Sequence, residues 1–326
     1  MATYSASAPS AGERPAWTIR RVLGVLGVAL LVIVAFVEIM PFVLTIANSF
    51  KCDPAVTNRP GAFIPAPPFG VQCETRNEAG AVVSRLTADQ QTNGIFFNPS
   101  FNGYETILQG SGQQNLPRWA LNTVIYAVTV TIGRLLFDSL AGYALARLKF
   151  PGSRAIFFII LGTLMIPGVV LLIPRFLMLR QMGLLNTYHG YFLVLAADAF
   201  GILLMKQFFE NIPKEIEEAA QVDGASRITT FFRIVLPMAT PALTALTIFS
   251  FQGQWNNFMD ALIIVGTNPS MSNLPLGLTQ LVGSGQDIQY DLVLAGSVIT
   301  TLPMALIFFF FQRYFVEGVS YSGIKG

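Results

Sequence analysis

The sequence predicts an all-α integral membrane protein with six membrane-spanning helices. Of its 326 residues, 53% are hydrophobic and only 12% are charged, and the mean hydropathy is +0.56. A soluble domain of this length does not bury so much apolar surface. Six apolar stretches are long enough to cross about 30 Å of hydrocarbon, which takes roughly 20 residues. They run from Ile19 to Ala47, Trp119 to Ala146, Ala155 to Leu177, Tyr191 to Phe209, Thr240 to Val265 and Leu292 to Tyr314.

The distribution of Lys and Arg predicts which side of the membrane each loop occupies. Six crossings put both chain ends on one side, and basic residues favour cytoplasmic loops. The segment from Gly266 to Asp291 has no Lys or Arg, although Arg175 and Arg180 flank the loop after the third span. We expect residues 1–18 and 315–326 to be cytoplasmic tails. The basic residues on that side are Arg14, Arg20, Arg21, Arg147, Lys149, Arg154, Lys214, Arg227, Arg233, Arg313 and Lys325.

The stretch 48–118, which follows the first span (19–47), is predicted to be an extracytoplasmic insert. It is rich in Pro, Gly, Asn and Gln, and it contains both cysteines, Cys52 and Cys73. This placement favours a disulfide in an oxidising compartment, and two unpaired thiols are the alternative. The first span follows a basic start, as a secretory signal does. Its apolar stretch exceeds the roughly 7 to 15 residues of a signal core, so we expect it to be retained.

A polar segment, 210–237, interrupts the apolar stretches and contains the run EAAQVDGASRITTFFRIVLP. Pro213 suits the first turn of a helix, Gly224 breaks that helix, and Ser226 can cap a second short helix. A small-residue face of the first helix fits a groove on a partner protein. An amphipathic helix lying on the bilayer surface explains the same pattern. The residues of this face are Ile216, Ala219, Ala220 and Val222.

This run resembles the signature of the membrane subunits of binding-protein-dependent ABC importers. In that family the loop forms the coupling helix, which sits in a cleft of a cytoplasmic ATPase. The resemblance implies a type I ABC importer permease fold in a bacterial inner membrane, with residues 119–314 as the core. It also implies contact with an ATPase through the loop. The residues expected to couple to the ATPase are Glu218, Ala219, Ala220, Asp223, Gly224, Ile234, Leu236 and Pro237.

Further motifs resemble the carbohydrate-uptake branch of this family, whose best-known member is the maltose importer. Together they cover the chain from about Phe101 to its end and imply a sugar as cargo. The last of them resembles the tail of the second membrane subunit of such importers. The motifs are Asn122-Thr123, the run from Ala141 to Arg147 with Phe150 and Gly152, the run from Gly183 to Thr187, Trp255-Asn256-x-Phe258-x-x-Ala261-Leu262 and Gln312-Arg313-Tyr314-Phe315-Val316-x-Gly318.

The resemblance also implies partners. These are a second permease subunit, a dimer of ATPase subunits that binds ATP and Mg, and an extracytoplasmic solute-binding protein. The binding protein would deliver a disaccharide, an oligosaccharide or a glycerol phosphate-type solute, and lipid would surround the spans. The chain has no G-x-x-x-x-G-K-[ST] phosphate loop. We therefore expect it to bind no cofactor or metal itself. The energy for transport would come from ATP hydrolysis by the partner ATPase and reach this chain through the polar loop.

Amide and carboxyl side chains lie within the fifth predicted span. Polar groups in hydrocarbon need partners or a water-filled cavity, and amides and carboxylates suit a hydroxyl-rich substrate. An aromatic face such as that of Trp255 can cover the C–H surface of a sugar. The candidate pathway residues are therefore Gln252, Trp255, Asn256 and Asp260. The alternative is that these groups, with Gln254 and Asn257, bridge helices and never meet substrate.

Charged residues in other spans allow further interpretations. Arg134 and Asp138 lie one turn apart in the second span and are predicted to form an intramembrane ion pair. This pair is either a gate or subunit contact, or a structural pair. A proton-coupled secondary transporter could use acids such as Asp198 and Glu38 as a relay. That alternative leaves the polar loop unexplained.

The sequence offers little of the chemistry of an enzyme or of a nucleic-acid-binding protein. Its one histidine, His189, lies beside a predicted external turn, so a His-based zinc site or a Ser-His-Asp triad cannot be assembled. Neither G-x-S-x-G nor H-E-x-x-H occurs. The net charge of +2 comes from the predicted cytoplasmic loops. No basic stripe is interleaved with aromatic residues, which argues against nucleic-acid binding.

Overall fold

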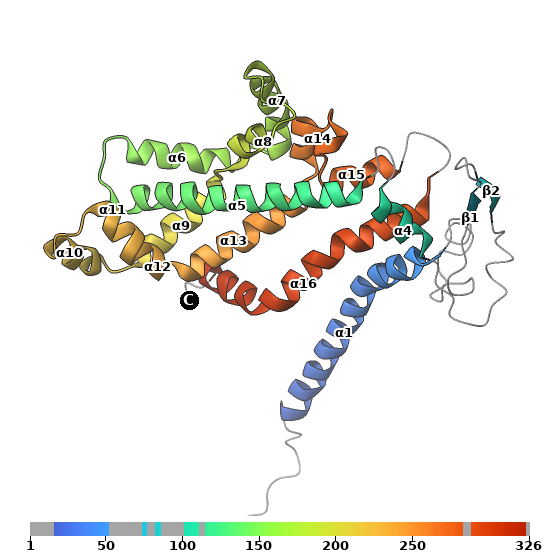
Figure 1. Cartoon of the computed structure of the whole chain (residues 1–326). Coiled ribbons are helices and arrows are strands. Elements are labelled where there is room, and N and C mark those ends of the chain that lie inside the picture. Colours follow the sequence, from blue (N-terminus) through green and yellow to red (C-terminus); the bar gives the residue numbers. More distant parts are fainter. Residues whose placement is uncertain are drawn as a thin grey trace, which may run out of the picture.

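The computed structural model is almost entirely helical over the residues that it describes (Figure 1). Cys52 and Cys73 fall outside these residues, so their disulfide stays a prediction. The backbone is described for residues 16–51, 74–76, 82–85, 101–110, 115–282 and 288–323, and side chains for 21–51, 101–110, 115–282 and 288–312.

Three single helices are each long and apolar enough to cross a membrane. They are α1 (Ala16–Ser49), α5 (Leu116–Arg147) and α16 (Tyr290–Gly323), which correspond to the first, second and sixth predicted spans. The start of α5 follows from its sequence. Asn115 Oδ1 accepts a hydrogen bond from the Arg118 N–H at 2.9 Å, and Pro117 occupies the first turn, where a missing N–H costs little.

Bent pairs of helices are also long and apolar enough for a membrane span when each pair is taken together. Counting each pair as one span gives up to six crossings in the described part of the chain. Pro167 lies at the sharpest break, where it cannot continue the helical hydrogen bonds. The pairs are α6 (Ser153–Thr163) with η1 (Gly168–Leu171) and α7 (Leu172–Gln181) at 103°, α8 (Tyr188–Leu195) with α9 (Ala199–Asn211) at 47°, and α11 (Arg227–Thr230), η2 (Phe231–Val235) and α12 (Leu236–Met238) with α13 (Thr240–Trp255) at 78°.

The fifth predicted span, Thr240–Val265, is not one helix. α13 ends at Trp255, and Asn257 helps to start the next helix because its Oδ1 accepts a hydrogen bond from the Asp260 N–H at 3.1 Å. Several polar residues of the predicted span therefore lie at or beside a helix break. The elements that follow are α14 (Met259–Val265), η3 (Pro269–Met271) and α15 (Leu274–Leu281).

α5 runs through the middle of the bundle. It packs along α9 and α13 and also contacts α8 and α15 (Figure 1). The close approach of α5 to α9 requires Gly142, because a Cβ there would lie 2.8 Å from the backbone nitrogen of Lys206. The rings of Tyr126 and Tyr191 stack with 4.0 Å between their centroids inside the core. These contacts hold α5 against its neighbours along its length.

The polar loop and the insert lie at opposite ends of α5 (Figure 1). α10 (Lys214–Val222) lies beyond the C-terminus of α5, and α4 (Asn102–Gln109) lies near its N-terminus. An antiparallel hairpin of β1 (Glu74–Arg76) and β2 (Val82–Arg85) occupies the same end as α4. The hydroxyl groups of Ser49 and Tyr104 are 2.6 Å apart and tie the end of α1 to α4.

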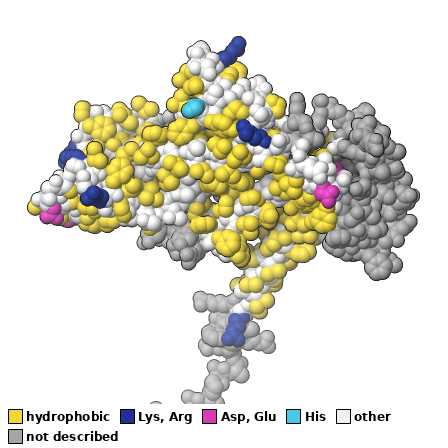
Figure 2. Space-filling model, viewed as in Figure 1, with side chains coloured by type: hydrophobic (Ala, Val, Ile, Leu, Met, Phe, Trp, Pro, Cys, Tyr) yellow, Lys and Arg dark blue, Asp and Glu magenta, His cyan; other side chains and the backbone are white. Residues whose placement is uncertain are grey.

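Hydrophobic side chains cover most of the visible face of the bundle (Figure 2). Leu31 on α1 and Phe310 on α16 are each 69% exposed. An apolar surface of this extent is unusual for a soluble monomer and suits contact with lipid or with another membrane subunit.

Candidate functional site

The polar loop folds into two helices that are joined at Gly224. α10 begins after Pro213, and Gly224 has a φ of +86°, a conformation that L side chains rarely adopt. Ser226 Oγ accepts a hydrogen bond from the Thr229 N–H at 3.2 Å, so Ser226 caps α11 as predicted. Local sequence signals therefore set both the end of α10 and the start of α11.

The predicted coupling residues divide between the outside and the inside of this loop. Ala220 faces inward and is 8% exposed, whereas Val222, which was predicted to share its face, is 87% exposed on the outer side. Leu236, at the start of α12, packs on the core around Val235, and Ile234 is half-buried beside it. The remaining members are exposed: Glu218, Ala219, Asp223, Gly224 and Pro237.

Glu217, which directly precedes the predicted coupling residues, is held inside the protein. Its Oε1 lies 2.7 Å from Arg147 Nε, and its Oε2 accepts a hydrogen bond from the Tyr143 hydroxyl at 2.9 Å. The Nε–H bond of Arg147 does not point at this carboxylate oxygen, so the contact acts through charge rather than as a hydrogen bond. Arg147 Nη2 also donates to the carbonyl of Ile212 at the end of α9.

Sequence reasoning singled out Glu218 and missed Glu217. The usable signal was helical spacing, because Glu217 and Ala220 are three residues apart and share the inner face of α10. Arg147 was visible too, as the last residue of the run that begins at Ala141. Nothing local in the sequence joins Arg147 to Glu217, since their contact depends on how α10 folds back on α5.

A polar cavity of ≈ 810 Å³ opens beside this contact. Arg147 and Glu217 form part of its wall, and basic residues outnumber acidic ones around it. The cavity therefore carries a net positive charge next to α10. Its charged lining residues are Arg147, Lys149, Lys214, Arg227, Glu217 and Glu218.

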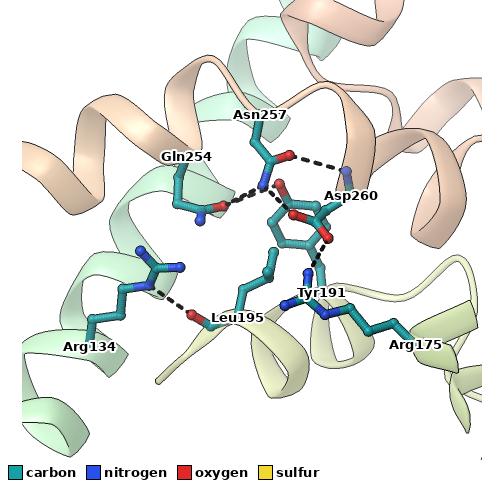
Figure 3. Close-up of polar contacts among 7 residues, drawn as sticks. All are labelled: Arg134, Arg175, Tyr191, Leu195, Gln254, Asn257 and Asp260. Carbon is teal, nitrogen blue, oxygen red and sulfur yellow. Dashed lines mark hydrogen bonds and ion pairs between the residues drawn. The ribbon is translucent and has the colours of Figure 1, made fainter. Parts of the chain in front are cut away.

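A second polar site forms where α13 gives way to α14 (Figure 3). Asn257 Nδ2 donates to Gln254 Oε1 at 3.3 Å and to Asp260 Oδ2 at 3.0 Å. Arg175 of α7 donates to Asp260 Oδ1 at 2.7 Å, and the Tyr191 hydroxyl of α8 donates to Gln254 Oε1 at 3.3 Å. This network joins α7, α8, α13 and α14 at the break. Gln254 and Asn257 therefore bridge helices, as the alternative interpretation has it.

The candidate pathway residues differ in exposure. Gln252 and Asn256 are exposed, and Asp260 is half-buried in its ion pair with Arg175. The amides of Gln252 and Asn256 are thus the exposed candidate groups, and Asn256 Nδ2 also donates to the Gln252 carbonyl at 3.1 Å.

Trp255 differs from the sequence-based expectation. Its side chain is 5% exposed, its Nε1–H donates to the Thr300 carbonyl at 3.2 Å, and its ring stacks on Phe251 with 5.7 Å between centroids. Packing between α13 and α16 covers the ring, so in this structure its face is not open to a sugar.

The predicted ion pair between Arg134 and Asp138 is replaced by a different arrangement. Arg134 Nη1 lies 3.3 Å from Asp198 Oδ2, and Arg134 Nε donates to the Leu195 carbonyl at 2.9 Å. Asp138 Oδ1 instead accepts a hydrogen bond from the Asp198 N–H at 2.9 Å. The break between α8 and α9 places a carboxylate and free backbone groups beside α5, and these compete with the pair expected within one helix.

The other residues that the sequence raised lie apart from both sites. His189 is exposed on α8, and Glu38 is exposed on α1. Asp198 is engaged by Arg134 rather than forming a chain of acids with Glu38. Within the described ranges no group of three or more His, Cys, Asp or Glu could hold a metal ion.

Comparison with known proteins gives consistent matches. Residues 138–321 match the family described as binding-protein-dependent transport system inner membrane component. Three relatives cover about two thirds of this chain. The arabinooligosaccharides transport system permease protein AraQ of Halalkalibacterium halodurans is 37% identical over 208 residues, which cover 64% of this chain and 74% of the relative. The trehalose/maltose transport system permease protein MalG of Thermococcus litoralis is 33% identical over 214 residues, 65% of this chain and 77% of the relative. The sn-glycerol-3-phosphate transport system permease protein UgpE of Pectobacterium atrosepticum is 33% identical over 215 residues, 65% of this chain and 76% of the relative.

The fold also matches a solved structure. The crystal structure of a bacterial ABC transporter involved in the import of the acidic polysaccharide alginate has a chain that aligns with a TM-score of 0.72. The alignment covers 94% of this chain and 100% of that chain at 24% sequence identity, so the likeness concerns the fold. Because the family match spans more than half of the sequence, the chain belongs to the binding-protein-dependent transport system inner membrane components, the non-enzymatic permease subunits of ABC importers.

Proposed function

We propose that this chain forms half of the translocation pathway of an ATP-driven sugar importer and couples that pathway to an ATPase through α10. The observation that carries the proposal is the position of the family signature. Glu218 and Ala219 are exposed on a helix that lies beyond the C-terminal end of α5, the central helix of the bundle. Glu218 is free to pair with a basic group of the ATPase, Ala219 allows close approach, and Gly224 sets the turn.

The proposed cargo is a disaccharide, an oligosaccharide or a glycerol phosphate-type solute. The names of the relatives support this class, because they refer to arabinooligosaccharides, trehalose and maltose, and glycerol-3-phosphate. The exposed amides of Gln252 and Asn256 can donate to and accept from sugar hydroxyls. A proton-coupled mechanism is disfavoured, since its candidate acid Asp198 is paired with Arg134.

The proposed assembly contains a second permease, a dimer of ATPase subunits carrying ATP and Mg, and an external solute-binding protein. The Lys and Arg distribution supports cytoplasmic chain ends and a cytoplasmic α10. Closure of the ATPase dimer would push on α10 and rotate the bundle as a rigid body around a fixed substrate site.

Purification and reconstitution test this function. The chain is purified in detergent, co-purifying proteins are identified, and uptake into liposomes is measured with and without ATP for labelled arabinooligosaccharide, maltose, trehalose and glycerol-3-phosphate. Recovery of an ATPase, a second permease and a sugar-binding protein, with ATP-dependent uptake of one of these solutes, is expected. A chain that purifies alone and drives uptake from a proton gradient without ATP would overturn the proposal.

A further inference from the structure

We propose that Glu217, Arg147 and Tyr143 form the joint through which α10 moves α5, a role that rests on the coupling function proposed above. These three residues are called the α10–α5 clamp. Both carboxylate oxygens of Glu217 contact α5, one at 2.7 Å from Arg147 Nε and the other at 2.9 Å from the Tyr143 hydroxyl. Tyr143 and Arg147 are four residues apart and share one face of α5. The clamp thus fixes both the position and the direction of α10.

Arg147 holds α10 at two points. Its Nη2 donates to the carbonyl of Ile212, which directly precedes Pro213 and the start of α10, while its Nε lies against Glu217 in the first turn. The Tyr143 ring adds apolar contact, since it packs against Phe231 in the segment after α10 with 4.8 Å between ring centroids. A displacement of α10 therefore acts directly on the last turn of α5.

Burial strengthens this contact. The side chains of Arg147 and Glu217 are 5% and 9% exposed, so most of their surface is covered by protein although they adjoin the polar cavity. Loss of one partner would leave the other charge uncompensated. The next residue, Glu218, faces outward. The two adjacent glutamates therefore have different tasks, because Glu217 binds α5 and Glu218 is left for the ATPase.

α5 can carry a displacement across the bundle because it is one unbroken helix of 32 residues. At its far end, Asn122 Nδ2 donates to the carbonyls of Ser270 and Ser272 at 2.9 Å and 2.8 Å. Beside it, Thr123 Oγ1 accepts a hydrogen bond from the Leu274 N–H at 2.8 Å. These bonds attach η3 and the start of α15 to α5. Movement at the clamp is thus transmitted to elements at the opposite end of the helix.

The experiment compares Glu217→Gln with Glu215→Gln in the complete transporter, reconstituted in liposomes with its ATPase, second permease and binding protein. Glu215 is exposed in the first turn of the same helix, so its variant controls for loss of one negative charge. We expect Glu217→Gln to assemble and hydrolyse ATP, but to import about tenfold less sugar per ATP because Arg147 loses its partner. Glu215→Gln should keep the wild-type ratio of uptake to ATP hydrolysis. The double variant Glu217→Arg with Arg147→Glu, which exchanges the two charges, should recover part of that ratio.

The ratio of uptake to ATP hydrolysis separates transmission from a structural role. If Glu217→Gln lowers both rates in proportion, or changes neither, the clamp does not transmit movement and the inference is overturned. If Glu217→Gln fails to assemble, Tyr143→Phe takes its place in the test, because it removes only one hydroxyl donor. The ratio of uptake to ATP hydrolysis is then measured for Tyr143→Phe. Absence of ATP-dependent uptake in the wild-type complex would instead overturn the coupling function itself.

Discussion

Gly201 of α9 lies directly against the carboxyl group of Asp138 on α5. A Cβ added at Gly201 would collide with Asp138 Oδ2 and lie 2.9 Å from both Asp138 Cγ and Leu246 Cδ1. Asp138 is fully buried, and its Oδ1 accepts a hydrogen bond from the backbone of Asp198 at the start of α9. The absence of a side chain at Gly201 is what allows the carboxyl group to reach this helix end.

Gly201→Ala should therefore separate α5 from α9. Overpacking of this kind costs roughly 1–3 kcal/mol, and thermal unfolding of the purified chain in detergent measures the loss. Gly162→Ala on α6 is the matched control, because a Cβ there meets no atom within 4 Å. Its stability should equal or slightly exceed that of the wild type. Equal unfolding temperatures for Gly201→Ala and the wild type would show that the close contact does not form.

Asp198→Asn should destabilise the protein more than Asp138→Asn. Arg134 pairs with Asp198, so removal of that charge leaves a cation without its partner inside the bundle. The expected loss is about 1–2 kcal/mol, since Asp198 is 36% exposed and solvent screens part of the interaction. Asp138→Asn keeps an oxygen that accepts the Asp198 N–H. Thermal unfolding compares the two variants, and the reverse order would favour the pairing of Arg134 with Asp138.

Local signals in the sequence predict most of the fold. Apolar length predicts the single-helix spans α1, α5 and α16, and hydrogen-bonding side chains predict helix starts such as the cap at Ser226. The left-handed φ at Gly224 likewise follows from one residue type. Such features depend on neighbours within a few residues, so the sequence alone suffices for them.

Contacts between distant segments could not be predicted in this way. Arg147 meets Glu217, and Arg134 meets Asp198, only because α10 folds back on α5 and because the α8–α9 pair bends by 47°. The length of the apolar stretch also predicts a single span over Thr240–Val265. The structure instead has two helices there, because Asn257 helps to start a new one. Hydropathy alone cannot predict such a break, since apolar residues continue on both sides of it.

Replacement of Trp255 should affect stability, whereas replacement of Gln252 should affect transport. Trp255→Ala leaves a cavity between α13 and α16 and removes the donor to the Thr300 carbonyl. A loss of roughly 3–5 kcal/mol is expected for a buried Trp. Trp255→Phe, which keeps much of the ring volume, should lose only about 1 kcal/mol with the hydrogen bond.

Gln252→Ala is the counterpart of these variants, because Gln252 is exposed and contributes little to the core. Its unfolding temperature should stay close to that of the wild type. If Gln252 lines the pathway as proposed, the KM for sugar uptake rises because one hydrogen-bonding group is lost. An unchanged KM for Gln252→Ala, together with an altered KM for a stably folded Trp255→Phe, would reverse the assignment of the two residues.

Substitution of Gly224 should act through backbone conformation rather than through space. A Cβ at Gly224 meets no atom within 4 Å, but its φ of +86° is disfavoured for side chains branched at Cβ. Gly224→Val should therefore distort the turn between α10 and α11, reduce recovery of the ATPase on purification and abolish uptake. Gly224→Asn should retain much of both, since asparagine tolerates positive φ. Gly162→Val, at a helical site where an added Cβ meets no atom within 4 Å, controls for the added volume. Equal uptake by Gly224→Val and Gly224→Asn would mean that the turn does not position α10 for the ATPase.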